Sequence, residues 1–281
     1  MKAIKKFSLL VCVFLFIGVG LASDKLCGTY PRYRLVSMNG ETFSSESLRG
    51  NAVFLSFFAR TCKPCEHEVP FLNELTQKYR DFLRVLTVPF MEKKEALTPL
   101  VKAWNITYPV CPDDDGAIAK AFNVSVLPRG FLIDHRGKIL SDYKGISEKD
   151  KSDILNRLSS LIPLIQQYRS AGPSFFVQPF DEKTPDAKGL GVTWAARITS
   201  WIKNEGAITI DSIQKADYII GGEVAKIGKM LGVVITISYA GTVEKSISDR
   251  VTADNDSRLQ ELFLEILRTI PYFPKKSTQS R

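Results

Sequence analysis

The chain has 281 residues, long enough for two domains that each bury a hydrophobic core without disulfide staples. Hydrophobic residues make up 44% of the sequence and charged residues 24%, a balance that excludes a disordered or collagen-like chain. The formal charge is +8, and five cysteines stand against only two histidines. Two histidines cannot form a His-rich metal site, so we expect the chemistry of this chain to be that of sulfur.

The first 22 residues are typical of a secretory signal peptide. Three lysines within the first six residues precede an apolar run from Leu9 to Ala22. This run is short for a membrane-spanning helix, which needs about 20 apolar residues. We expect cleavage after Ala22 and an exported, periplasmic mature protein. An uncleaved membrane anchor and lipidation at Cys27 are the alternatives.

Removal of residues 1–22 takes away three lysines and no acidic residue, which lowers the formal charge from +8 to +5. The remaining basic residues are spread along the chain. They do not form the basic stripe with interleaved aromatic residues that marks nucleic-acid binding, so we expect no nucleic-acid partner.

Between residues 23 and 168 the pattern alternates strands and helices. Four strands are expected, at residues 52–59, 83–88, 130–133 and 138–141; the first is nearly all apolar, as a strand covered on both faces should be. Four helices are expected, at residues 64–79, 93–104, 117–122 and 148–161. Asp113, Asp114 and Asp115 precede the third helix, where carboxylates suit the free N–H groups and the positive dipole end.

The sequence Ser170-Ala171-Gly172-Pro173 is typical of a connection between domains, and we expect the linker at residues 169–173. A new pattern follows at residues 174–273. It predicts strands at residues 175–177, 218–226, 232–239 and 243–249, and helices at residues 192–204 and 258–270. Trp194 and Trp201 share one side of the first of these helices, where we expect them in the core. Residues 274–281 form a polar tail.

Cys62-Lys63-Pro64-Cys65 follows the apolar strand and opens a helix. A helix N-terminus offers free N–H groups and a positive dipole end, which stabilise a thiolate on Cys62, and Lys63 adds a positive charge. We expect Cys62 to attack a substrate disulfide and Cys65, one turn into the helix, to resolve the mixed disulfide. Two alternatives stay open: a zinc half-site that borrows His67, and a purely structural disulfide.

Motifs at residues 40–50, 57–70, 112–124 and 127–134 surround this CxxC sequence. Together they resemble the thioredoxin superfamily, and within it the TlpA/ResA-like envelope thiol-disulfide oxidoreductases and related redoxins. The resemblance covers about residues 30–165 and implies an α/β thioredoxin fold, with a central mixed sheet flanked by helices. It also implies an enzyme that exchanges thiols and disulfides with protein substrates. A membrane or periplasmic electron donor takes the place of a cofactor, and no metal is expected.

The resemblance implies roles for three further residues. Pro128 matches the cis-proline that faces the active-site disulfide and lets the preceding backbone pair with an extended substrate strand. Glu68 matches the active-site glutamate and would handle the proton that Cys65 loses during resolution; its alternative is an exposed helix carboxylate. Pro70 matches the proline that kinks the helix.

Three positions depart from the family pattern. Thr61 replaces the aromatic residue before the first cysteine, Phe58 replaces a tryptophan, and Ser56 stands where many thioredoxins carry a buried acid. These departures leave the reaction type unchanged and affect the substrate surface, the redox potential and the proton route.

Cys27 and Cys111 remain once the signal peptide and the CxxC motif are set aside. Each is a small core residue, or the two form a structural disulfide in an oxidising compartment. His135 lies in a turn between two strands, and we expect it to be exposed.

Residues 174–273 open with Phe175-Phe176-Val177 and later contain Ala216-Asp217-Tyr218 before an apolar and glycine stretch. These residues resemble the TolB amino-terminal domain and CsgG- and LpoB-like envelope lipoproteins. The resemblance implies a smaller α+β domain that does no catalysis and binds an envelope protein partner.

The whole sequence therefore predicts an exported thiol-disulfide oxidoreductase with an appended interaction domain. One alternative is a redoxin-type thiol peroxidase, which needs a Pro-x-x-x-Thr-x-x-Cys setting that does not precede Cys62. The other is a non-enzymatic envelope scaffold whose function lies in the C-terminal half.

Overall fold

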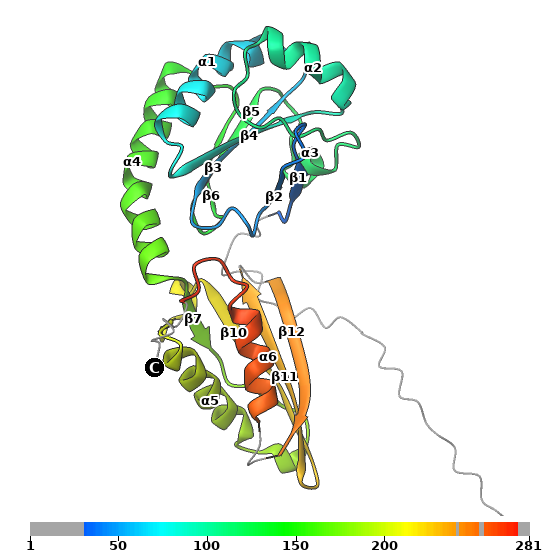
Figure 1. Ribbon diagram of the computed structural model, residues 1–281, viewed down its shortest axis with the longest axis vertical. Coiled ribbons are helices and arrows are strands. Elements are labelled where there is room, and N and C mark those ends of the chain that lie inside the picture. The colour runs from blue at the N-terminus through cyan, green and yellow to red at the C-terminus, as the bar shows by residue number, and fades with distance from the viewer. Residues whose placement is uncertain (1–30, 240–241, 253–255, 275–281) are drawn as a thin grey trace, which may run out of the picture.

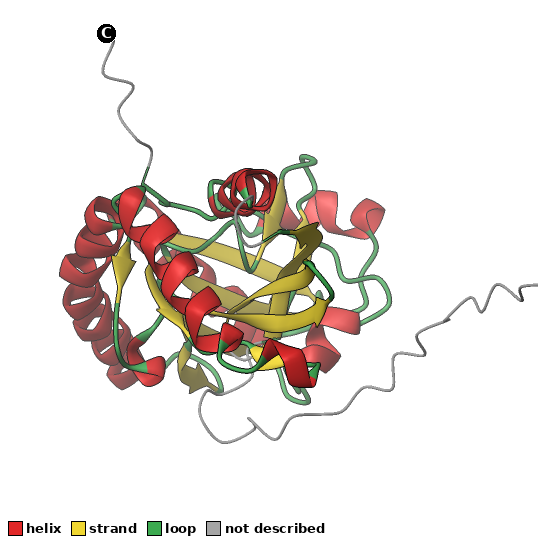
Figure 2. Cartoon of the chain, turned by 90° about the horizontal axis from the view of Figure 1, so that it is seen from below, coloured by secondary structure: helices red, strands yellow, loops and turns green. Residues whose placement is uncertain are grey.

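The computed structural model describes residues 31–239, 242–252 and 256–274. The predicted signal peptide, Cys27 and the tail from residue 275 lie outside these residues. Two domains lie end to end and are joined by one long helix along the side (Figure 1). Seen from below, the strands lie in the middle of the molecule and the helices around them (Figure 2).

The first domain is built on a four-stranded mixed sheet. Its strands are β3 (Ala52–Phe58), β4 (Leu83–Pro89), β5 (Arg129–Ile133) and β6 (Ile139–Tyr143), in the order β4-β3-β5-β6. Strand β3 pairs parallel with β4 and antiparallel with β5, and all seven of its residues are buried. A separate hairpin joins β1 (Arg34–Val36) and β2 (Thr42–Ser44). This is the expected thioredoxin-type mixed sheet, with its apolar strand at the centre.

Four helices accompany this sheet: α1 (Lys63–Lys78), α2 (Lys94–Ala103), α3 (Ala117–Ala121) and α4 (Glu148–Ala171). Asp113 accepts hydrogen bonds from the N–H groups of Ile118 and Ala119, at 3.1 and 2.9 Å. Asp115 accepts one from the N–H of Ala117, at 3.0 Å. The prediction that the aspartates cap this helix is therefore confirmed.

The fourth helix is longer than the sequence predicts. It was expected to end near residue 161, yet α4 continues through Pro163 to Ala171. Leu161, Ile165 and Tyr168 are buried and extend one apolar side of the helix, so tertiary packing outweighs the backbone hydrogen bond that a proline removes. The expected linker therefore begins inside a helix, and the chain turns at Gly172, whose φ is +77°.

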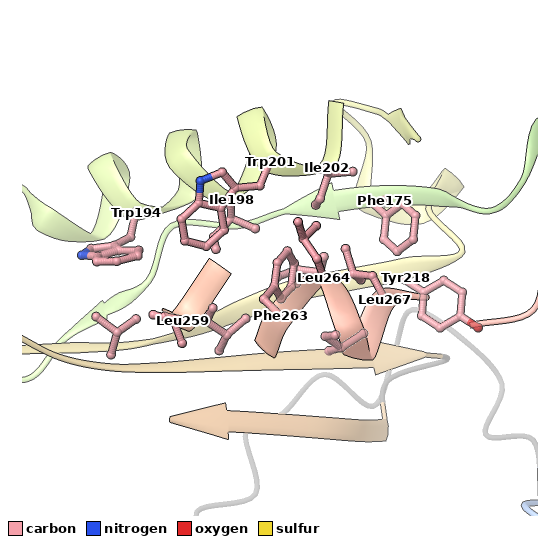
Figure 3. Packing of buried hydrophobic residues seen from close by; sticks show 14 of the residues in the cluster. Phe175, Trp194, Ile198, Trp201, Ile202, Tyr218, Leu259, Phe263, Leu264 and Leu267 are labelled. Carbon is pink, nitrogen blue, oxygen red and sulfur yellow. The ribbon is translucent and has the colours of Figure 1, made fainter. Parts of the chain in front are cut away.

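The second domain has one sheet covered on one face by helices. The sheet order is β12 (Thr242–Val251), β11 (Met230–Tyr239), β10 (Tyr218–Ile227), β7 (Ser174–Val177) and β9 (Ile208–Thr209), and the short β8 (Asp181–Glu182) also pairs with β10. The helices are α5 (Leu190–Asn204) and α6 (Ser257–Leu267), with 3-10 turns at Pro185–Ala187 and Ile213–Lys215. Trp194 and Trp201 pack with Phe263 in the core between helices and sheet (Figure 3), which confirms their expected burial.

A buried arginine joins the two domains. Arg49, just before β3, is only 5% exposed and forms a bidentate ion pair with Glu244 of β12. Its guanidinium also lies 3.3 Å from the ring centroid of Tyr239 and donates a hydrogen bond to the hydroxyl of Tyr218. Next to it, Gly50 (φ +79°) leaves room for the ring of Tyr272, which would lie 2.1 Å from an added Cβ.

His135 lies at the same junction, and the prediction that it is exposed is wrong. It is 5% exposed and meets the ring of Tyr168 edge-on. Its neighbour Arg136 pairs with the buried carboxylate of Asp217 in the second domain, at 2.8 Å. The sequence around His135 is typical of a surface turn, but the second domain covers this turn.

Candidate active site

The reactive sulfurs lie where β3 ends and α1 begins. Cys62 is the N-cap residue of α1 and forms a disulfide with Cys65, with a Cα–Cα distance of 5.3 Å. Cys62 is half-buried, whereas Cys65 is 4% exposed. Because a substrate can approach only the outer sulfur, this geometry favours Cys62 as the attacking residue and Cys65 as the resolving one.

The backbone at the start of α1 is arranged to favour a negative sulfur. No side chain caps this helix end, so its first N–H groups and positive dipole end are available to a thiolate on Cys62, the N-cap residue. Lys63 stabilises a thiolate on Cys62 less than the sequence suggests. Its ammonium is 85% exposed and lies 3.3 Å from the carboxylate of Glu66, which shares its charge.

Apolar side chains surround the inner sulfur. Cys65 belongs to a buried cluster with Phe58, Leu97, Leu100 and Val110. Phe58, which replaces a tryptophan of the family pattern, lies 5.5 Å from the ring centroid of Trp104. The sequence gives no sign of this pairing, because Trp104 ends a helix 46 positions away. With Cys65 only 4% exposed among these side chains, a nearby protein group is favoured as the acceptor of its proton.

Glu68 is buried, which is inconsistent with the alternative of an exposed helix carboxylate. It lies one turn after Cys65 on α1 and is 7% exposed. Burial raises the pKa of Glu68 to about 7, opposed by a backbone hydrogen bond from Ile146 and assisted by the charge of Asp150. Its Oε1 atom has no hydrogen-bond partner among the described residues. A carboxyl with these properties can take up and release a proton near neutral pH.

Pro128 lies on the other side of this carboxyl. The Leu127–Pro128 peptide bond is cis, as the resemblance implies. The carbonyl of Pro128 accepts a hydrogen bond from the N–H of Gly145, at 3.1 Å. A Cβ added to Gly145 would lie 3.9 Å from both Oε1 of Glu68 and Cγ of Pro128, so the two side chains converge there. Leu127, the residue before Pro128, packs in the cluster that holds both cysteines.

Two other residues that the sequence singles out, Ser56 and Cys111, do not belong to this group. Ser56 is buried in β3, where its side chain offers no carboxylate, so Glu68 remains the acid placed by the fold next to Cys65. Cys111 is buried and forms no disulfide with another described cysteine. Because Cys27 lies outside the described residues, the disulfide between Cys27 and Cys111 stays a prediction.

The residues that the structure describes contain no group of three or more His, Cys, Asp or Glu side chains arranged to hold a metal ion. In the same part of the chain, no helix combines the length and the apolar character that crossing a membrane requires.

Comparison with known proteins agrees with this geometry. Residues 28–141 match the AhpC/TSA family. The thiol-disulfide oxidoreductase ResA of Bacillus thuringiensis subsp. konkukian is 33% identical over 134 residues, which are 47% of this chain and 76% of the relative. ResA of Bacillus subtilis is 30% identical over 131 residues, which are 45% of this chain and 72% of the relative.

Solved structures also match part of the chain. StoA from Bacillus subtilis has 20% sequence identity and a TM-score of 0.41, and covers 47% of this chain and 98% of its own. A thiol-disulfide oxidoreductase from Bacteroides fragilis has 24% identity and a TM-score of 0.42, and covers 47% and 99%. With the CxxC pair at the end of a buried strand and its ResA relatives, this chain belongs to the family of ResA-type thiol-disulfide oxidoreductases, enzymes that act on protein thiols.

Proposed function

We propose that the mature chain exchanges disulfides with envelope proteins, with Cys62 as nucleophile, Cys65 as resolving residue and Glu68 as proton acceptor. The observation that carries this proposal is a half-buried Cys62 bonded to a buried Cys65, one helical turn before a buried Glu68 carboxyl that converges with Pro128 at Gly145. Pro128 and the backbone before it would hold the substrate strand.

The reductive cycle runs in two exchanges. The Cys62 thiolate attacks one sulfur of the substrate disulfide, forms a mixed disulfide and releases the other substrate sulfur as a thiolate. Cys65 then gives its proton to Glu68, attacks the Cys62 sulfur and releases the second substrate thiolate. The substrate gains two electrons and the enzyme is left with the Cys62–Cys65 disulfide. A membrane or periplasmic donor restores the dithiol; the reverse sequence oxidises a substrate dithiol.

Trapping the intermediate tests this assignment. In a Cys65→Ser variant the mixed disulfide cannot be resolved, so protein partners should accumulate covalently on Cys62 and be identifiable by mass spectrometry. The double variant with Cys62→Ser is the control and should trap nothing. Recovery of no thiol-linked partner from an envelope preparation in which the unmodified enzyme is active would contradict the proposal.

Export to the periplasm is the second part of the proposal. It is supported by the basic start and apolar run of residues 1–22. Amino-terminal sequencing of the protein from a periplasmic fraction should begin at Ser23. A protein that retains Met1 in a membrane fraction would favour the anchor instead.

We assign the second domain a role in binding an envelope protein. Its support is the resemblance of residues 174–273 and the absence of histidine from this half of the sequence. A photo-cross-linker at Ile227, which is 76% exposed at the end of β10, should capture an envelope protein in cells. Absence of any cross-linked product at several such surface positions would contradict this role.

A further inference from the structure

The long strand β12 forms one edge of the second domain's sheet. It pairs with β11 on one side, and no described strand pairs with its other side. In Figure 1 this outer side faces away from the rest of the domain. An edge strand of ten residues presents a row of unpaired N–H and C=O groups, which is a template for pairing with another strand.

The sequence of this strand is symmetric about Ile247. Two residues at the same distance before and after Ile247 are either of the same type or opposite in charge. The matching residues are Ser246 with Ser248, Lys245 with Asp249, Glu244 with Arg250, and Val243 with Val251. If two copies of β12 pair antiparallel around a two-fold axis at Ile247, Lys245 of each copy faces Asp249 of the other. Opposite charges across such a pair are stabilising.

Other antiparallel registers lose this match. A shift by one residue in one direction places Lys245 opposite the partner's Arg250, and a shift in the other direction places Glu244 opposite the partner's Asp249. A shift by two residues places Ile247 opposite either a lysine or an aspartate. Like charges directly opposite are destabilising, so the charge pattern selects a single register.

The central residues are free to pair. Lys245, Ser246 and Ser248 are exposed. Lys245 has no ion-pair partner in the described part of the chain. Asp249 accepts a hydrogen bond from the N–H of its neighbour Arg250 at 2.8 Å, and its one ion-pair contact among the described residues is a long one, 3.7 Å to Arg258. The beginning of the strand is different. Glu244 is held by Arg49, and the carbonyl of Val243 accepts a hydrogen bond from Arg32 at 3.4 Å, so pairing is expected to centre on residues 245–249.

Helix α6 offers apolar surface beside this edge. Arg258, Leu262 and Ile266 are spaced four residues apart and therefore share one side of the helix. The contact of Arg258 with Asp249 places this side toward β12. Leu262 is 36% exposed, and Ile266 and Ile247 are half-buried. A two-fold axis perpendicular to the sheet keeps both α6 helices on the same face, where these apolar residues meet their counterparts.

We propose that β12 is a homodimer interface: two copies of the chain pair their β12 strands antiparallel, centred on Ile247, and join their sheets into one. The Lys245–Asp249 pairs form twice, as a two-fold interface requires. The second copy is favoured over another partner because the complementary charges are on this same strand. Antiparallel pairing places the two first domains at opposite ends of the dimer, which leaves each dithiol independent of the other.

Charge reversal with a complementary mixture tests this pairing. Lys245→Asp places two aspartates opposite two aspartates, and Asp249→Lys places lysines opposite lysines, so each variant should lose dimer affinity at least about tenfold. An equimolar mixture of the two variants restores both opposite-charge pairs and should dimerise again. Sedimentation equilibrium of the mature chain between about 1 μM and about 1 mM, the range of weak dissociation constants, measures the effect.

Lys229→Asp, in the exposed turn between β10 and β11, is the matched control and should dimerise like the unmodified chain. Circular dichroism establishes that each variant is folded. A mature chain that stays monomeric over the whole range overturns the proposal. So does a dimer that persists in both single variants, because it would form through another surface, or a mixture that remains monomeric.

Discussion

The two ends of strand β3 differ in how exposed their surroundings are. At its carboxyl end the chain enters the CxxC turn, where Cys62 is half-buried and Lys63 is exposed. At its amino end Arg49 and Asn51 are buried: Arg49 pairs with Glu244 of the second domain, and Asn51 accepts a hydrogen bond from Arg169 of α4. The carboxyl end, which leads to the reactive cysteines, is accessible; we call it the reactive end. The amino end is covered by charged groups that pair across the domain boundary; we call it the closed end. The length of this small sheet therefore separates the reactive cysteines from the surface that contacts the second domain.

The largest effect is expected from removing the arginine at the closed end. Arg49→Met leaves the Glu244 carboxylate buried without its bidentate partner, which should lower the free energy of unfolding by about 3–5 kcal/mol. Urea unfolding followed by tryptophan fluorescence measures this. Reduction of a small-molecule disulfide should be unchanged where the variant is folded, because Cys62 lies at the other end of β3.

Arg157→Met is the control for this prediction. Arg157 pairs with Asp153 on the exposed surface of α4, at 2.7 Å, and its loss should change the free energy of unfolding by less than about 1 kcal/mol. Equal effects of the two variants would show that the Arg49 contacts do not hold the domains together.

A smaller effect is expected at the reactive end, at Glu68. Its pKa is about 7 in the folded chain against 4.5 for a free carboxyl, so between these values the folded state binds more protons than the unfolded one. Stability should therefore decrease as pH rises from 4.5 to 7, by about 3 kcal/mol at about 1.4 kcal/mol per pKa unit. Glu68→Gln should remove this decrease and be more stable than the unmodified chain at pH 8.

The same variant should be a slower enzyme. Under the proposed role, ionised Glu68 accepts the Cys65 proton. The rate of resolution should then rise with pH through about 7, and Glu68→Gln should lose this inflection together with about a hundredfold in rate. Stopped-flow reduction of a protein disulfide measures it. Glu66→Gln, at the surface of the same helix turn, is the control. An unchanged inflection in Glu68→Gln would show that another group moves the proton.

The smallest effect is expected at His135, again at the closed end. Burial lowers the pKa of His135 and Arg136 lowers it further, while Asp134 and Asp217 act in the opposite direction. The unfolded chain then takes up a proton that the folded chain does not, so stability should fall as pH drops below 6.5. His135→Gln should reduce this loss in urea unfolding, whereas exposed His67→Gln should leave it unchanged.

The sequence is most informative at the reactive end because its signals are local. The buried strand, the CxxC pair, Glu68 one turn later and Pro128 lie within short motifs. In the structure Glu68 and Pro128 converge at Gly145, and Leu127 packs with both cysteines. The closed end has no such signal. Arg49 and Glu244 are separated by 195 positions, so no pattern links them before the chain folds. The path of α4 through Pro163 and the burial of His135 also depend on packing between distant segments.

The position of the domain boundary fixes the distance between the dithiol and the junction with the second domain. The seven residues of β3 separate the docking contacts from the CxxC turn, a span of about 23 Å at about 3.3 Å per residue. A protein bound at the junction of the two domains would have to extend at least this far along the first domain before one of its disulfides could meet Cys62.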